Sequence, residues 1–227
     1  MTEATFEQLA GELASERQRR ERAEAAASEE RARALRAQLN PHFLFNALTG
    51  LVATLDVRAA AQRDHVLRLS ELLRETLRAS EHAEHEVCEE LALACAYLRI
   101  EERHRAAGLD WNVRVAPGCE SALIPSLLLL PLVENATTHG SCNAGGRLNV
   151  EIVAGRHGRH LVVRLANTCV GERSSVGQRS SAGTGLGLRN VRDRLAAHFR
   201  GAAALSVQRS EGRFEVAVEL PYLKRVA

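Results

Sequence analysis

A histidine directly after a proline lies within a stretch that has helical apolar spacing. Apolar residues recur beyond it on one helix face, at Leu44, Leu48, Leu51 and Leu55. Pro41 removes a backbone donor and crowds the preceding turn, so we expect the helix to kink or restart beside His42. Asn46 follows one turn later on the same face. A neutral imidazole displayed there is a nucleophile, although an isolated histidine beside a helix start more often has a structural role.

A second group of polar residues follows an apolar helical run. Helix spacing places Asn135 and His139 on one face, with Glu134 on the next. An amide oxygen is a suitable Mg²⁺ ligand, because this ion prefers hard oxygen donors and keeps waters and phosphates. A nearby histidine can donate to a phosphate. For this segment alone, a helix whose polar side faces solvent is the simpler explanation.

The third group is a glycine-rich turn that runs into a predicted helix. It comprises Gly183, Thr184, Gly185, Leu186 and Gly187. Glycine lets the backbone approach a phosphate, and a helix N-terminus offers free N–H groups and a positive dipole end. The turn is not a Walker loop, and it lacks the last glycine of the dinucleotide-binding fingerprint. A loop end with a helix cap is the alternative.

A fourth candidate group begins at Asn167, ends at Gly171 and follows the predicted strand 161–165. A polar side chain at a strand end can recognise the edge of a purine by hydrogen bonding. An ordinary strand-to-loop turn accounts for these residues equally well.

The composition argues against several classes of protein. A formal net charge of +2 and an aromatic content of 4% disfavour direct nucleic-acid binding. No apolar run approaches the roughly 20 residues that span a bilayer, and the N-terminus lacks a secretory signal pattern. The five cysteines form no CxxC pair, which favours free thiols in a reducing cytoplasm over a disulfide framework or zinc site.

The N-terminal half of the chain has a helical pattern. Residues 1–33 are rich in Glu, Arg and Ala, and predict a charged helix that is either a marginal coiled coil or a solvated single helix. Residues 34–108 continue as three helical segments, each with one apolar stripe. Such helices cannot bury their stripes alone, so we expect a helical bundle that is completed by a second chain.

From residue 109 the pattern changes to a mixture of strands and helices. Strands are predicted at 111–115, 148–153, 161–165, 205–207 and 214–220, and helices at 126–138 and 188–199. Residues 171–183 have little apolar content and predict a mobile loop. We expect an α+β sandwich over residues 109–227, in which one mixed sheet carries helices on one face.

Three segments, in this order and spacing, resemble the two-component sensor histidine kinases of the LytS type. They are Asn-Pro-His-Phe-Leu-Phe-Asn at 40–46, Leu-Pro-Leu-Val-Glu-Asn-Ala with a following His-Gly at 130–140, and Gly-Thr-Gly-Leu-Gly-Leu at 183–188. The resemblance covers residues 35–221. It implies a dimerisation and histidine phosphotransfer bundle, followed by an ATP-binding sandwich of the Bergerat type.

The resemblance also implies a role for each group. His42 would be the phosphoacceptor, and Asn135 would hold Mg²⁺. The glycines at 183–187 would surround the phosphates of ATP, with residues 172–182 as a lid. In the family an Asp contacts the adenine amino group. Asn167 occupies that position here, where its amide oxygen still accepts a hydrogen bond.

The implied function is an ATP-dependent histidine kinase that passes phosphate from His42 to an aspartate of a response regulator of the LytTR DNA-binding type. We expect a cytoplasmic homodimer, which is either served by a separate sensor protein or part of a longer chain. Glu134 is the candidate general base, since Phe43 replaces the acidic residue that many histidine kinases carry there. Asn46 would orient a water that dephosphorylates the regulator. The alternative is a catalytically weak nucleotide-binding or dimeric regulatory module without autokinase activity.

Overall fold

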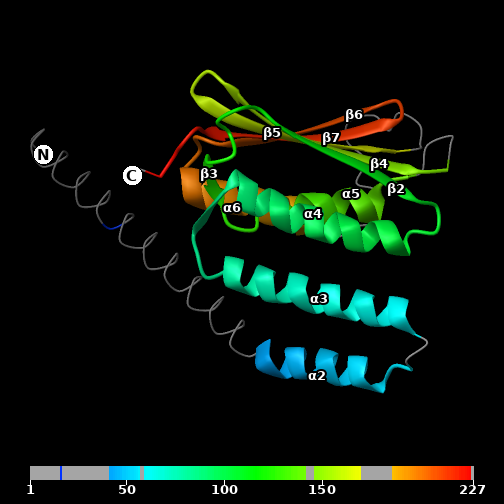
Figure 1. Ribbon diagram of the computed structural model, residues 1–227. Helices are drawn as coiled ribbons and strands as arrows, with labels where there is room; N and C mark the ends of the chain where they lie inside the picture. Colours follow the sequence, from blue (N-terminus) through cyan, green and yellow to red (C-terminus); the bar gives the residue numbers. More distant parts are fainter. Residues whose placement is uncertain (1–15, 17–40, 57–58, 142–145, 170–185, 226–227) are drawn as a thin grey trace, which may run out of the picture. The chain divides into compact units, whose positions relative to one another are not determined.

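The structure is a computed structural model that describes residues 16, 41–56, 59–141, 146–169 and 186–225 (Figure 1). Contacts divide the chain into two units, Met1–Arg58 and Ala59–Ala227. In the first unit, helix α2 (Pro41–Thr54) contains His42 and Asn46. Their side chains, the chain just before Pro41 and all of the predicted helix 1–33 except Glu16 lie outside the described part.

The second unit is built on a five-stranded mixed sheet. Its strand order is β2-β4-β5-β7-β6, in which β2 and β4 are parallel and the other neighbours are antiparallel. The strands are β2 (Leu109–Val115), β4 (Leu148–His157), β5 (His160–Thr168), β6 (Ala204–Ser210) and β7 (Arg213–Pro221). The alternating pattern predicts all five, and each observed strand is longer than the predicted one.

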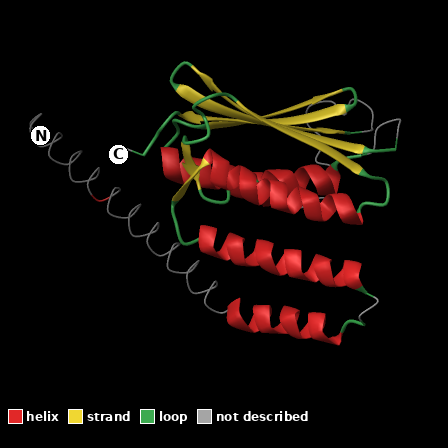
Figure 2. Ribbon diagram, viewed as in Figure 1, coloured by secondary structure: helices red, strands yellow, loops and turns green. Residues whose placement is uncertain are grey.

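Three helices, α4 (Val87–His104), α5 (Leu130–His139) and α6 (Leu186–Phe199), cover one face of the sheet (Figure 1, Figure 2). Every second side chain of β4 is buried, in the order Leu148, Val150, Ile152 and Ala154. These side chains form one core with the three helices. The predicted α+β sandwich, with a mixed sheet and helices on one face, is confirmed.

Helix α4 belongs to this core, although the sequence pattern groups it with the helical half. A capping box begins the helix, in which the backbone N–H of Glu86 donates to the carboxyl group of Glu89 at 2.8 Å. The stripe of α4 that is buried in the sandwich core consists of Val87, Leu91, Ala94 and Leu98. The domain boundary at residue 108 stays a prediction, while α4 packs with the strands that follow it.

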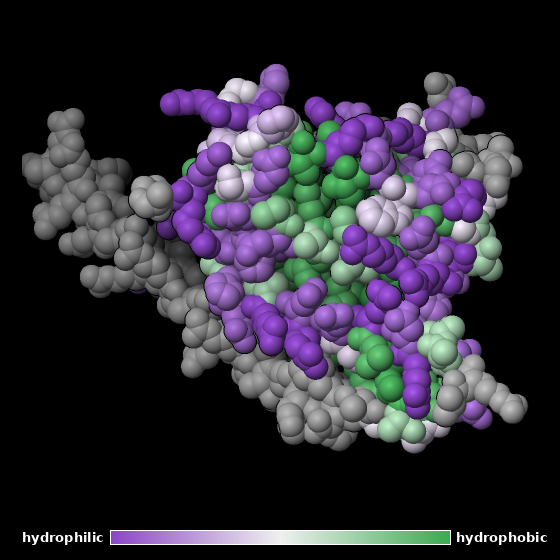
Figure 3. Space-filling view, in the orientation of Figure 1, coloured by the Kyte–Doolittle hydropathy of each residue, from purple (hydrophilic) through white to green (hydrophobic). Residues whose placement is uncertain are grey.

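Helix α3 (Ala60–Ala79) packs against α4 on the side away from the sheet (Figure 1). A second, smaller apolar cluster joins the two helices and consists of Leu72, Ala79, Leu93 and Ile100. Leu67 and Leu69 of α3 remain exposed, and apolar surface interrupts the hydrophilic cover in the space-filling view (Figure 3). None of the described helices is long and apolar enough to cross a membrane.

The sequence does not predict the short strands β1 (Glu84–Glu86) and β3 (Leu123–Pro125), which form a separate antiparallel pair. Three residues are too few for an alternating pattern to show. Helix α5 begins at Leu130 and not at Ser126, with Pro131 in its first turn, where a missing N–H is tolerated. Residues 126–129 instead form the turn that leads into α5.

Candidate functional site

Helix α5 displays three of the predicted polar residues. Its buried residues are Leu130, Leu132, Val133, Ala136 and Thr137, of which Leu132, Val133 and Ala136 belong to the core shared with the sheet. Glu134 and His139 are exposed, and Asn135 is half-buried. Neighbouring protein atoms displace water from one side of Glu134, and this desolvation raises the pKa of its carboxyl group above the ordinary value. A carboxylate with a raised pKa is a better proton acceptor.

Asn167 lies inside β5, one residue before its end, and is only 4% exposed. Its Nδ2 donates to the carbonyl oxygen of Thr168 at 2.9 Å. Its Oδ1 is buried and has no hydrogen-bond partner among the described residues. Such an acceptor costs free energy unless a donor reaches it. The amino group of adenine is a donor of this kind, so the buried amide fits a purine.

The end of α5 passes directly beside this amide. Gly140 follows the helix, and its N–H donates to the carbonyl oxygen of Ala136 at 2.9 Å. A Cβ at Gly140 would lie 2.3 Å from that oxygen, 2.5 Å from Leu148 Cδ1 and 3.0 Å from Asn167 Nδ2. Only glycine fits in this space, so Gly140 sets how closely the helix approaches the buried amide.

Replacing Gly140 with alanine is expected to lower the free energy of unfolding by about 1–3 kcal/mol, because the added methyl group overpacks a closed site. ATP binding should weaken as well, since the clash displaces Asn167 or the end of α5. Chemical unfolding and ATP titration measure the two effects. Gly155→Ala is the control, because a Cβ there meets only Ala116, at 4.0 Å. Equal stability of the two variants would contradict this expectation.

Thr168 holds the segment that follows α5. The backbone N–H of Ser141 donates to the carbonyl oxygen of Thr168 at 3.0 Å, and Thr168 Oγ1 donates back to the carbonyl oxygen of Ser141 at 2.8 Å. The backbone N–H of Asn149 donates to the same hydroxyl at 3.0 Å. Thr168 thereby joins the exit of α5 to β4 and fixes the strand end next to Asn167.

Arg105, just after α4, binds the C-terminal carbonyls of α5. Its Nη1 donates to the carbonyl oxygen of Thr137 at 2.8 Å, and its Nη2 to that of Gly140 at 3.4 Å. The hydroxyl of Tyr97 lies 3.1 Å from that of Thr137. A cation at a helix C-terminus satisfies the last carbonyls and interacts favourably with the helix dipole. Local sequence does not reveal this support, because Arg105 and Thr137 are 32 residues apart.

The first turn of α6 lies beside the first turn of α5. Gly187 is the second residue of α6, and a Cβ there would lie 3.6 Å from the carbonyl oxygen of Pro131. A helix of 14 residues offers free N–H groups and a positive dipole end at this point. Leu186 begins the helix, with its side chain outside the described part. The other predicted residues of these segments also lie outside it: Gly171, Gly183, Thr184 and Gly185.

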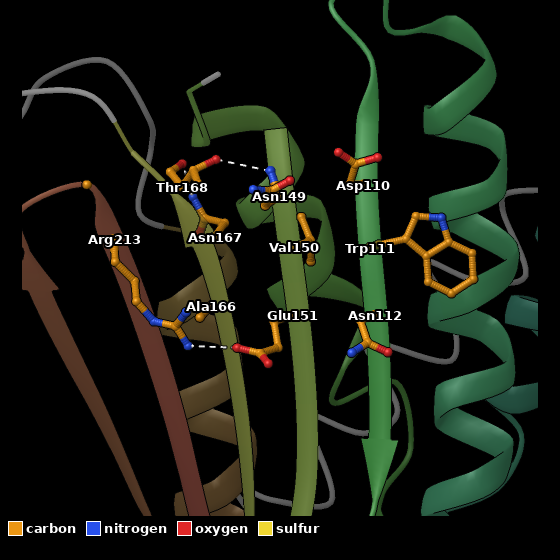
Figure 4. A pocket seen from close by; sticks show the side chains of 11 residues that line it. Asp110, Trp111, Asn112, Asn149, Val150, Glu151, Ala166, Asn167, Thr168 and Arg213 are labelled. Carbon is orange, nitrogen blue, oxygen red and sulfur yellow. Dashed lines mark hydrogen bonds and ion pairs between the residues drawn. The ribbon is translucent and has the colours of Figure 1, made fainter. Parts of the chain in front are cut away.

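A hollow of about 410 Å³ lies on the other face of the sheet, which no described helix covers. Asn112, Glu151 and Arg213 line it, and Asn167 and Thr168 lie at its edge (Figure 4). Arg213 Nη2 lies 3.0 Å from Glu151 Oε2, and Arg213, together with Arg114, holds the pKa of the Glu151 carboxyl group below its ordinary value. These paired charges offer little to a ligand, whereas the α5 side has a buried acceptor without a described partner.

Comparison with known proteins identifies relatives of the chain. A family model described as histidine kinase matches residues 30–106. The sensor protein LytS of Staphylococcus epidermidis is 27% identical over 197 residues, which cover 84% of this chain and 33% of LytS. The sensor histidine kinase BtsS of Escherichia coli is 31% identical over 188 residues, which cover 82% of this chain and 32% of BtsS. The chain is similar to the LytS-type sensor histidine kinases.

The chain spans about a third of the length of these two relatives. A solved structure of a bacterial phosphotransferase matches the fold with a TM-score of 0.51 at 11% identity, over 79% of this chain and 88% of that chain. In this chain, the end of α5 lies beside Asn167, and α6 begins beside α5. His42 and Asn46 lie in the first unit.

Proposed function

We propose that the chain is an ATP-dependent protein histidine kinase that phosphorylates itself on His42. The observation that carries this proposal is the buried Oδ1 of Asn167, an acceptor that has no partner in the described part of the chain, in a residue whose Nδ2 lies beside the end of α5. The match of residues 30–106 to the histidine kinase family supports His42 as the phosphoacceptor. The phosphate then passes to an aspartate of a response regulator.

In this proposal the nucleotide is held by β5, α5 and the start of α6. Asn167 Oδ1 accepts from the adenine amino group, and Asn135 offers Mg²⁺ an amide oxygen, a donor that suits this ion. Bound Mg²⁺ neutralises charge on the phosphates. The glycines at 183–187 and the N–H groups of α6 surround the phosphates, and His139 donates to one of them.

His42 is the nucleophile of the proposed reaction. The reference pKa of histidine is about 6.5, so the ring is mostly neutral at cytoplasmic pH. A ring nitrogen forms a bond to the γ-phosphorus while the bond to the β–γ bridging oxygen breaks, and ADP leaves. Glu134, whose pKa desolvation raises, accepts the proton that the ring releases. Asn46 orients a water when the regulator is dephosphorylated.

A homodimer completes the helical half in this proposal. Leu51 of α2 is 49% exposed, and Leu67 and Leu69 of α3 are 53% and 41% exposed. A second copy that covers them would remove this apolar surface from water. Residues 34–108 would form the dimerisation and phosphotransfer domain, and residues 109–227 the ATP-binding domain. The other proposed partners are a LytTR-type response regulator in the cytoplasm and a separate sensor protein.

Incubation of the full chain with Mg²⁺ and γ-labelled ATP tests the proposed function. The chain is expected to acquire label that is acid-labile and alkali-stable, as a phosphorus–nitrogen bond is. ATP labelled on the α-phosphate is the control and should leave no label, because only the γ-phosphoryl group moves. ATP binding without label would support the alternative, a nucleotide-binding regulatory module without autokinase activity. Absence of both binding and label would overturn the proposal.

A further inference from the structure

The turn 126–129 connects β3 to α5 and carries an unusual backbone conformation. Leu127 in this turn has a φ of 53°, in the left-handed region that a leucine rarely adopts. A conformation of this kind persists only where the surrounding structure fixes it. Side chains from α4 and α6, and a bond to the end of α3, supply that fixation.

Glu90 of α4 makes the first of these contacts and is fully buried. Its Oε1 accepts from the backbone N–H of Leu127 at 2.5 Å, and its Oε2 accepts from that of Leu129 at 3.1 Å. Leu129 is the residue that caps α5, and its own side chain makes no capping hydrogen bond. A buried carboxyl group is stable only with such partners. Glu90 therefore anchors the start of α5 from a neighbouring helix.

The other contacts reach α6 and α3. Arg194 Nη1 donates to the carbonyl oxygen of Leu127 at 2.8 Å and also to that of Ser126. Ser126 Oγ donates to the carbonyl oxygen of Ala79 at 2.7 Å. Ala79 is the last residue of α3, so Ser126 satisfies one of the carbonyls that a helix end leaves without an intrahelical partner. The same turn thus joins the end of α3 to the start of α5.

We propose that residues 126–129 form a coupling turn that transmits the position of the end of α3 to α5, with Glu90 as its positioning residue. A shift of α3 pulls on the hydroxyl of Ser126, and the turn leads directly into the helix that carries Asn135. The path is one stretch of backbone with buried hydrogen bonds at both ends. This inference rests on the proposed nucleotide site at α5.

Coupling is reciprocal, so a nucleotide at α5 must influence the end of α3 by the same free energy. The backbone N–H of Ser80 donates to the carbonyl oxygen of Thr76 at 3.0 Å, and its hydrogen-exchange rate therefore reports on the last turn of α3. In the full wild-type chain, we expect ATP with Mg²⁺ to slow this exchange by about fivefold or more, the lower end of typical couplings.

Ser126→Ala removes one hydrogen bond, the one between the turn and the last residue of α3. This variant is expected to bind ATP about as tightly as the wild type, because the turn keeps its bonds to Glu90. The exchange response at Ser80 should become clearly smaller, because the turn loses its side-chain bond to Ala79, while the packing of Leu127 on the α3 cluster remains. Ser210→Ala, at an exposed position in β6, is the matched control and should retain the full response.

Glu90→Gln tests the positioning role. The new NH₂ group faces a backbone N–H where Glu90 offered an oxygen. We expect the Kd for ATP to rise about tenfold, since α5 loses an anchor at its start. Glu120→Gln, which changes an exposed carboxyl group, is the control. A purely structural role of Glu90 would lower thermal stability and leave the Kd of the folded protein unchanged.

The outcomes separate this inference from the proposed function. Failure of the wild-type chain to bind ATP overturns the proposed function itself. ATP binding without an exchange response at Ser80, or a full response in Ser126→Ala, overturns the coupling turn alone. An unchanged Kd in Glu90→Gln overturns the positioning role. Ser126→Ala removes a single hydrogen bond and should fold. The exchange experiment on this variant therefore tests the coupling turn even if Glu90→Gln fails to fold.

Discussion

Replacing His42 with alanine is expected to reduce acid-labile phosphorylation of the chain to background. Alanine has no nucleophilic nitrogen, and catalysis of phosphoryl transfer depends mostly on positioning the nucleotide against one acceptor. Incubation with γ-labelled ATP, followed by separation under alkaline conditions, measures the label. ATP affinity should stay at the wild-type value, because the unit Ala59–Ala227 contains the proposed nucleotide site.

Two controls make this result specific to His42. His157→Ala changes an exposed histidine at the end of β4 and should label as the wild type does. His42→Gln keeps a polar side chain at the position and should be as inactive as the alanine variant. Acid-labile, alkali-stable label that persists in His42→Ala would exclude His42 as the phosphoacceptor.

Replacing Asn167 with alanine is expected to weaken ATP binding by about 5- to 150-fold, which corresponds to about 1–3 kcal/mol. The buried Oδ1 is the proposed acceptor for the adenine amino group, and without it that group is desolvated with no partner. Titration calorimetry at constant Mg²⁺ measures the change. Asn149→Ala is the matched control, because Asn149 lies on the strand face opposite to the buried Val150 and should not touch the nucleotide.

A nucleotide analogue sharpens the test of Asn167. Purine riboside triphosphate lacks the adenine amino group, so the wild-type chain should bind it more weakly than ATP. Asn167→Ala should bind the two nucleotides alike, because the variant and the analogue remove opposite ends of one hydrogen bond. The same preference for ATP in both chains would exclude recognition of adenine through Asn167.

Periodicity predicts most helices and strands of this chain, because a repeating set of apolar side chains lies within one segment. The period of an apolar stripe does not show which helix or sheet packs against it. The stripe of α4 therefore pointed to a helical bundle, although Leu91 and Leu98 pack in the sandwich core. Strands β1 and β3 were not predicted, because three residues each are too few to show an alternating pattern.

Within the candidate site, the sequence predicts those polar residues that interrupt an apolar pattern. Asn135 stands out because it follows an apolar run, whereas Asn167 was expected beyond the end of its strand. β5 continues through Thr168, since pairing with β7 holds Asn167 opposite Phe214. No role was expected for Glu90, whose partner Leu127 lies 37 residues further along the chain. Its contribution exists only once the surrounding helices have packed.

Helix α5 is held at both ends, by Glu90 where it starts and by Arg105 where it finishes. It has ten residues, and each residue of an α-helix turns the chain by about 100°. One residue inserted or deleted between the two anchors would therefore rotate Asn135 by about that angle relative to one of them, the start of α5 if the change precedes Asn135 and Gly140 if it follows. The length of this segment is thus as strongly constrained as its composition. The exposed turn at Gly158, between β4 and β5, is under no such constraint.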